Sequence, residues 1–236
     1  MSRWKFSTAV LCFALAGASA LSLSFAPASS AQEARPAPSP TPANVFQEAR
    51  AVNSNATPDT DAFEFEMNGF AYHINANGNG RRTKRTKTRG FNLRLDRGDS
   101  ISHLFYKEFE GDLLLLLHVS DTGDGAGVVT RLEQPSMRSL WRQRINAPDV
   151  GEPLREGRHL YVTGKGFVGN LDLGTGEYVW QLDGLEDMRG DEPKPLGTFD
   201  APELKGDEVL FRERSVYNPR RTLVLDKKSG KVIRVE

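Results

Sequence analysis

The sequence has a single cysteine, Cys12, close to its N-terminus. One cysteine cannot form an intramolecular disulfide, and no cysteine farther along the chain can bind zinc or act as a nucleophile. The chain also lacks an excess of either charge, because 31 Lys and Arg balance 31 Asp and Glu. The balanced charge argues against a dedicated nucleic-acid-binding domain, and a charged partner must be met by a local cluster of side chains.

Sequence motifs of common enzymes are missing as well. The chain has no Gly-x-Ser-x-Gly nucleophile elbow and no phosphate-cradling loop. Residues 164–169 match the glycine pattern of dinucleotide sites, but no helix follows to hold a pyrophosphate, so we interpret them as a turn between strands. Four separate histidines lack metal-ligand spacing and are interpreted as structural: His73, His103, His118 and His159. We predict no catalytic residue, cofactor or metal site.

The N-terminus has the order of a secretory signal. Two cations precede the apolar run 6–17, and the small residues 18–20 follow it. Cleavage after Ala20 and cleavage after Ala31 both fit this pattern. A retained membrane anchor would need about 20 apolar residues, more than this run supplies. We expect export to the periplasm or the cell exterior, with no transmembrane helix after signal removal.

Composition divides the chain into three parts. Residues 1–31 are the expected signal peptide, and residues 32–60 form a linker rich in Pro, Ala and Ser with room for a short helix at 43–52. Residues 61–236 are expected to fold. In that part, short runs with apolar and polar residues in alternation are separated by Gly, Asn and Asp, which is typical of β-strands. The predicted strands are 63–67, 70–74, 91–95, 113–119 and 128–132.

A turn element recurs along the predicted all-β domain. An acidic residue ends one strand, a hydroxyl residue and a glycine follow in the turn, and a large residue lies on the returning strand. The copies are Asp172, Thr175, Gly176 and Trp180; Asp226, Ser229 and Gly230; Glu133, Ser136 and Trp141; and, faintly, Asp96. The acid and the hydroxyl can bond turn amides, and the tryptophan is large enough to fill a seam between sheets.

The order of strands, turn and tryptophan over 157–180 resembles the pyrroloquinoline-quinone-like repeat of quinoprotein-like β-propellers. That resemblance implies radially arranged four-stranded blades, in a family that includes quinone-dependent dehydrogenases and non-catalytic scaffolds of outer-membrane protein assembly. The four acids lie 37, 39 and 54 residues apart, close to one blade each. About four blades therefore fit, whereas quinone-binding members have about eight. A small ring, an incomplete propeller and a dimer of arcs all stay open.

One segment concentrates positive charge. Six cations lie within residues 81–89, namely Arg81, Arg82, Lys84, Arg85, Lys87 and Arg89, and the turn-forming residues 77–80 precede them. Two hypotheses remain: a solvated hairpin without a ligand, or a docking patch for lipid head groups, acidic polysaccharide or an acidic protein face. Nucleic acid is disfavoured because no aromatic residue lies within the run. Replacing Arg82, Lys84, Arg85 and Lys87 with Gln should leave the stability nearly unchanged, because exposed cations contribute little to folding.

Together these features favour an exported, non-catalytic binding or scaffold module of the cell envelope that needs no cofactor. The alternative is a small quinoprotein-like oxidoreductase, or the propeller portion of one. A propeller fold alone does not decide between them, because such folds carry many unrelated functions. The partner is expected to be a protein or an anionic envelope component.

Overall fold

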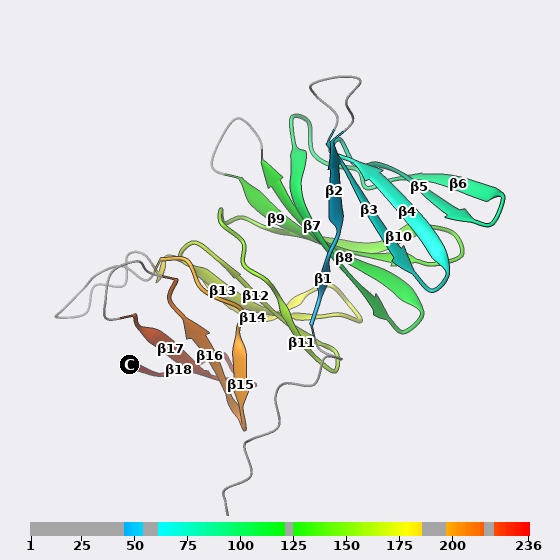
Figure 1. Cartoon of the computed structure of the whole chain (residues 1–236). Coiled ribbons are helices and arrows are strands. Elements are labelled where there is room, and N and C mark those ends of the chain that lie inside the picture. Colours follow the sequence, from blue (N-terminus) through cyan, green and yellow to red (C-terminus); the bar gives the residue numbers. More distant parts are fainter. Residues whose placement is uncertain (1–44, 54–60, 121–124, 186–196, 215–219) are drawn as a thin grey trace, which may run out of the picture. The chain divides into compact units, whose positions relative to one another are not determined.

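A computed structural model describes residues 45–53, 61–120, 125–185, 197–214 and 220–236. Strands and turns make up this part of the chain, which confirms the predicted all-β class (Figure 1). No helix in the described ranges is long and apolar enough to cross a bilayer. The expected signal peptide lies outside the described residues.

Four antiparallel sheets follow one another along the chain, each built from consecutive strands except that β1 joins the second sheet (Figure 1). The first holds β2 (Arg50–Asn53), β3 (Asp61–Met67), β4 (Phe70–Asn75), β5 (Asn79–Lys84) and β6 (Lys87–Asn92). The second holds β1 (Gln47–Glu48), β7 (Ser100–Phe109), β8 (Asp112–Ser120), β9 (Ala126–Glu133) and β10 (Arg138–Ile145). The third holds β11 (Leu154–Glu156), β12 (His159–Gly164), β13 (Phe167–Asp172) and β14 (Tyr178–Leu182). The fourth holds β15 (Glu203–Lys205), β16 (Glu208–Arg212), β17 (Thr222–Asp226) and β18 (Val232–Val235).

This is the predicted blade-like array, with two five-stranded sheets where four strands were expected. Two other expectations were wrong in detail. The helix allowed at 43–52 is absent, because residues 45–53 pair as β-structure across three sheets: Val45 bridges to Leu154, β1 pairs with β7, and β2 pairs with β3. Residues 45–53, expected to be linker, therefore belong to the folded part of the chain. The strand predicted at 91–95 ends at Asn92.

Apolar cores lie between consecutive sheets. Strand β8 supplies two of them, because neighbouring side chains of a strand point to opposite faces. Leu113, Leu115 and Leu117 pack against the first sheet, whereas Leu114 and Leu116 pack against the third. All five leucines are fully buried, so this strand has no solvent-exposed face. A further core, which contains Trp180 and Phe211, joins the third sheet to the fourth.

Each of the last three sheets ends in an outer strand that contains a one-residue bulge. The extra residues, which pair with nothing, are Leu140, Val179 and Ile233, and they are 41–48% exposed. Residues two apart in a regular strand share a face. The extra residue Val179 breaks that rule, so Tyr178 packs toward the second sheet and Trp180 toward the fourth. The bulge is what directs the tryptophan into the next seam.

The outward faces of the first and fourth sheets are polar. On the first sheet, Arg50, Glu64, His73 and Arg81 lie side by side across four strands, and His73 Nδ1 is 2.9 Å from Glu64 Oε1. On the fourth sheet, Arg234 lies where the second and third sheets have tryptophan. Its guanidinium pairs with Glu208, at 2.6 Å, and with Glu236. Polar outer faces are typical of the terminal units of a stacked array.

Candidate functional site: a cationic hairpin

The basic run forms the hairpin of β5 and β6, which we call the cationic hairpin and define as residues 81–89. Six residue pairs join the strands in unbroken register, from Asn79 and Asn92 to Lys84 and Lys87. A two-residue loop connects them, and its first residue, Arg85, has a φ of 54°. Every residue from Lys84 to Arg89 is exposed. The turn expected at 77–80 joins β4 to β5, with Gly78 at a φ of 80°.

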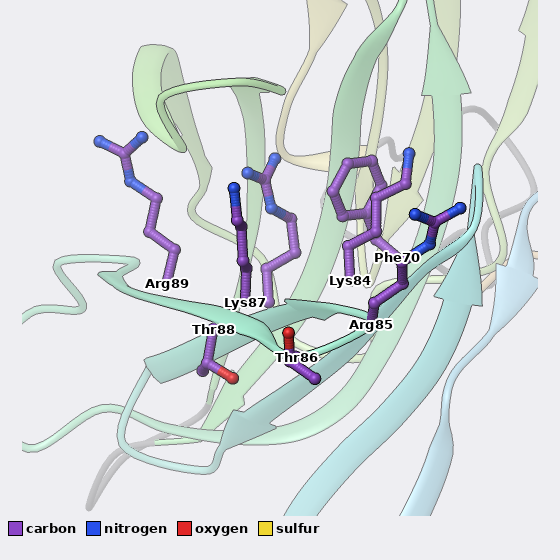
Figure 2. A pocket seen from close by; sticks show the side chains of 8 residues that line it. Phe70, Lys84, Arg85, Thr86, Lys87, Thr88 and Arg89 are labelled. Atoms are coloured by element: carbon purple, nitrogen blue, oxygen red, sulfur yellow. The ribbon is translucent and has the colours of Figure 1, made fainter.

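Arg81 lies on one face of the hairpin with Thr83 and Thr88, whereas the cations Arg82, Lys84, Lys87 and Arg89 share the other face. Lys84, Lys87 and Arg89 project to this second face, and Thr88 points to the first (Figure 2). Their side chains surround a cavity of about 490 Å³ that has Phe70 in its wall. Lys84 Nζ lies 4.5 Å from the centre of the Phe70 ring, a cation–π contact that holds the lysine without neutralising it.

None of the six cations has a carboxylate within 4.0 Å among the described residues. Several arginines elsewhere in the described part of the fold pair with carboxylates. Arg131 lies 2.7 Å from Asp112, and Arg234 pairs with Glu208. The cationic hairpin therefore brings together six cations without a carboxylate partner in the described ranges, in a chain whose total charge is balanced.

Two of the six cations are held by the neighbouring sheet. Arg82 donates to the carbonyl oxygen of Gln134 and, at 3.3 Å, to that of Pro135. Arg89 donates to the Pro135 oxygen at 2.9 Å. Close by, burial raises the pKa of Tyr72, and the charge of Arg82 opposes this rise. The expectation that Arg82, Lys84, Arg85 and Lys87 contribute little to folding therefore does not fit Arg82.

The tryptophans of the repeat make the same kind of contact between sheets. Trp141 Nε1 donates to the carbonyl of Leu173 at 3.1 Å, and Trp180 Nε1 donates to that of Lys227 at 3.0 Å. Each acceptor directly follows a repeat acid, Asp172 or Asp226. Gln134 likewise follows Glu133, so Arg82 does in the first sheet what tryptophan does in the next two.

The repeat acids stabilise the turns, as their spacing predicts. The Asp172 carboxylate accepts hydrogen bonds from the backbone N–H of Gly174, at 2.6 Å, and of Thr175, at 3.2 Å. Burial raises the pKa of Asp172, but these hydrogen bonds and Arg158 outweigh it and hold that pKa below its usual value. Asp226 accepts from the N–H of Ser229 at 2.7 Å. The Ser136 hydroxyl donates to the Glu133 carboxylate, as the Ser229 hydroxyl does to Asp226.

The fourth copy of the repeat, placed at Asp96, was wrong. Asp96 lies between β6 and β7, where its carboxylate pairs with Arg144 at 2.9 Å and Arg142 at 3.5 Å. The corresponding turn of the first sheet runs from Asn75 to Asn79 and contains neither an acid nor a hydroxyl residue. The repeat pattern could not locate this turn.

Comparisons with known proteins find a likeness of fold only. No family model and no curated protein matches the chain. Among solved structures, the quinohemoprotein alcohol dehydrogenase from Comamonas testosteroni is 12% identical over 81% of this chain and 37% of that one, with a TM-score of 0.49. The quinohemoprotein alcohol dehydrogenase ADHIIG from Pseudomonas putida HK5 is 9% identical over 73% of this chain and 33% of that one, with a TM-score of 0.48. BamB from Moraxella catarrhalis is 13% identical over 81% of this chain and 79% of that one, with a TM-score of 0.31. This chain thus spans about a third of the length of the two dehydrogenases.

Proposed function

We propose that the protein is an exported, non-catalytic binding module that docks through the cationic hairpin on an anionic component of the cell envelope. The observation that carries this proposal is the set of unpaired cations on one exposed hairpin. Anchoring by Arg82 and Arg89 keeps that hairpin in place, so the cations form a fixed surface. A preorganised surface loses less conformational entropy on binding than a mobile one.

The hairpin is electrostatically strained without a ligand. Arg82 lies directly opposite Arg89, and Lys84 lies directly opposite Lys87. Like charges in directly opposite positions destabilise a strand pair. An anionic group placed between these side chains would relieve that repulsion and replace it with attraction. The charge distribution therefore favours an anionic partner over a neutral one.

A salt-dependent binding measurement on the exported chain tests the proposal. The probes are phosphatidylglycerol vesicles, alginate and an acidic peptide. At least one should bind at 0.01 M salt and lose affinity at 0.15 M, because the screening length falls from about 30 Å to about 8 Å. The triple variant Lys84→Gln, Arg85→Gln and Lys87→Gln should abolish binding.

A control with the same charge change is available on the fourth sheet. Lys205, Lys228 and Lys231 are exposed, and replacing all three by Gln should leave binding intact. Absence of binding to every probe at 0.01 M salt contradicts the proposal, as does equal loss in both triple variants.

Export is part of the proposal and has its own test. Protein purified from its own host should begin at Leu21 or Gln32, the residues after the two cleavage sites. An intact Met1 in the cytosolic fraction would contradict export. No observation on the described residues favours the oxidoreductase alternative.

A further inference from the structure

Strand β6 presents an open edge. It is the outermost strand of the first sheet, and no described strand pairs with its far side. The N–H of Leu93 donates to the carbonyl of Gly78 at 2.9 Å, which continues the β5–β6 ladder beyond Asn92. In an antiparallel ladder, hydrogen-bonded and non-hydrogen-bonded pairs alternate. The backbone groups of Thr88, Gly90 and Asn92 therefore point to the open edge.

The β6 edge differs from the other outer edges of the described sheets. The outer strands β10, β14 and β18 each contain a bulge, which interrupts the row of backbone donors and acceptors. Pairing between β5 and β6 has no such shift over its six pairs. An unbroken edge is a template for another strand, and charged side chains restrict which strands can add to it.

Side chains beside this edge specify the charge of a partner. Lys87 and Arg89 lie on one face of β6, and Thr88 and Gly90 lie on the other. A strand added here would place every second side chain next to Lys87 and Arg89, and opposite charges in such cross-strand positions are stabilising. The remaining side chains would lie beside Thr88 and Gly90, where there is space for small or β-branched residues.

We infer that β6 is the docking edge for an extended acidic protein segment, which adds to the first sheet as a further strand. This inference rests on the proposed function and specifies its partner. A lipid surface or a polysaccharide would use the charge of the hairpin but not the unbroken row of backbone groups. The loop residues Arg85 and Thr86 also offer no apolar side chain for insertion into a bilayer.

The first experiment compares two peptides that have the same charge. The first peptide is an acetylated peptide amide with four Glu-Thr repeats. The second has the same sequence, but its threonines are N-methylated. In the inferred register, the glutamates lie beside Lys87 and Arg89, and the threonines exchange hydrogen bonds with Thr88 and Gly90. N-methylation removes those donors, so we expect at least about tenfold weaker binding to the exported chain, the equivalent of one or two hydrogen bonds.

The second experiment changes the edge without changing its charge. Gly90→Pro removes an N–H that points outward and leaves the β5–β6 hydrogen bonds in place, since proline is tolerated on edge strands. Gly90→Ala is the control, because a Cβ on Gly90 would meet only the Gly80 oxygen, at 3.9 Å. The proline variant should bind the Glu-Thr peptide about tenfold less tightly, and the alanine variant should bind it normally. Thr88→Pro with Thr88→Val repeats the comparison if Gly90→Pro does not fold.

Different results separate this inference from the proposed function. If Gly90→Pro and the N-methylated peptide bind normally while the triple charge variant does not, the hairpin binds anions but β6 is not a docking edge. If vesicles or alginate bind and the Glu-Thr peptide does not, the partner is not a protein strand and the inference is overturned. If no probe binds, the inference and the proposed function both fail.

Discussion

The indole ring of Trp180 closes over the backbone of Gly230 in the next sheet. A Cβ on Gly230 would lie 2.6 Å from atoms of that ring, so only glycine fits. Trp141 has the same relationship to Gly176, where a Cβ would lie 2.5 Å away. Two residues of the repeat that are far apart in sequence thus form one contact, a tryptophan of one sheet on the turn glycine of the next.

Removing the Trp180 ring should destabilise the protein by about 3 to 5 kcal/mol, the usual cost of deleting a large aromatic side chain from a core. The residue is 9% exposed and packs against Phe211 between the third and fourth sheets. Val179→Ala is the control, because Val179 is 45% exposed and should cost less than about 0.5 kcal/mol. Urea denaturation measures both, and equal losses would contradict the packing between these sheets.

The Gly230 contact can be tested apart from backbone strain. Gly230 and Gly206 both have positive φ, at 69° and 61°, but a Cβ on Gly206 would have nothing within 4 Å. Gly206→Ala should therefore cost about 1 kcal/mol, from backbone strain alone. Gly230→Ala should cost a further 1 to 3 kcal/mol or so, because its Cβ overpacks the tryptophan ring. Similar free energies of unfolding for the two variants would show that Trp180 does not lie on Gly230.

Where the repeat was regular, the sequence predicted the fold well. The acid, the turn glycine and Trp141 or Trp180 recur at fixed spacing for two reasons. In each sheet the acid must hydrogen-bond the turn, and the tryptophan must fill the space between that sheet and the next one. In the first sheet the strands at 63–67 and 70–74 were predicted, but the contact with the second sheet was not, because Arg82 replaces the tryptophan there. When an arginine lies within a basic run, nothing in the sequence indicates that its guanidinium donates hydrogen bonds to the next sheet.

The sequence was sufficient to predict which residues form the candidate site, but not how those residues are held in place. Charge density alone identified residues 81–89, since like charges in such numbers do not form a buried strand. The anchoring of Arg82 depends on contacts with Gln134 and Pro135, which lie far along the sequence. Contacts over such sequence separations leave no local pattern in the sequence.

Within the cationic hairpin, Arg82 and Lys84 should respond differently to substitution. Arg82→Gln removes the donors to Gln134 and Pro135 and should lower the free energy of unfolding by about 1 to 2 kcal/mol, since hydrogen bonds from a charged group are the stronger ones. Lys84→Gln should change it by less than about 0.5 kcal/mol, because that side chain is exposed. Urea titration of the two variants measures the difference, and equal stability would contradict anchoring of the hairpin by Arg82.

His118 should make the protein less stable as the pH falls. Burial, followed by the charges of His103 and Arg214, lowers the pKa of His118 from 6.5 to about 4. Its Nε2 atom is buried without a hydrogen-bond partner among the described residues, which agrees with a neutral ring. Between pH 6.5 and 4, the unfolded chain therefore binds a proton at His118 that the folded chain does not bind.

The free energy of unfolding must therefore decrease by up to about 3 kcal/mol as the pH is lowered from 6.5 to 4. Below pH 4 the contribution of His118 no longer changes, because the ring is protonated in both the folded and the unfolded state. His118→Phe should remove this part of the pH dependence, so the difference in unfolding free energy between variant and parent should change between pH 7 and pH 4. Phe105→Leu alters a neighbour of the ring and keeps the titrating group, so it should retain the slope of the parent. Parallel curves for His118→Phe and the parent would show that the His118 ring titrates normally in the folded protein.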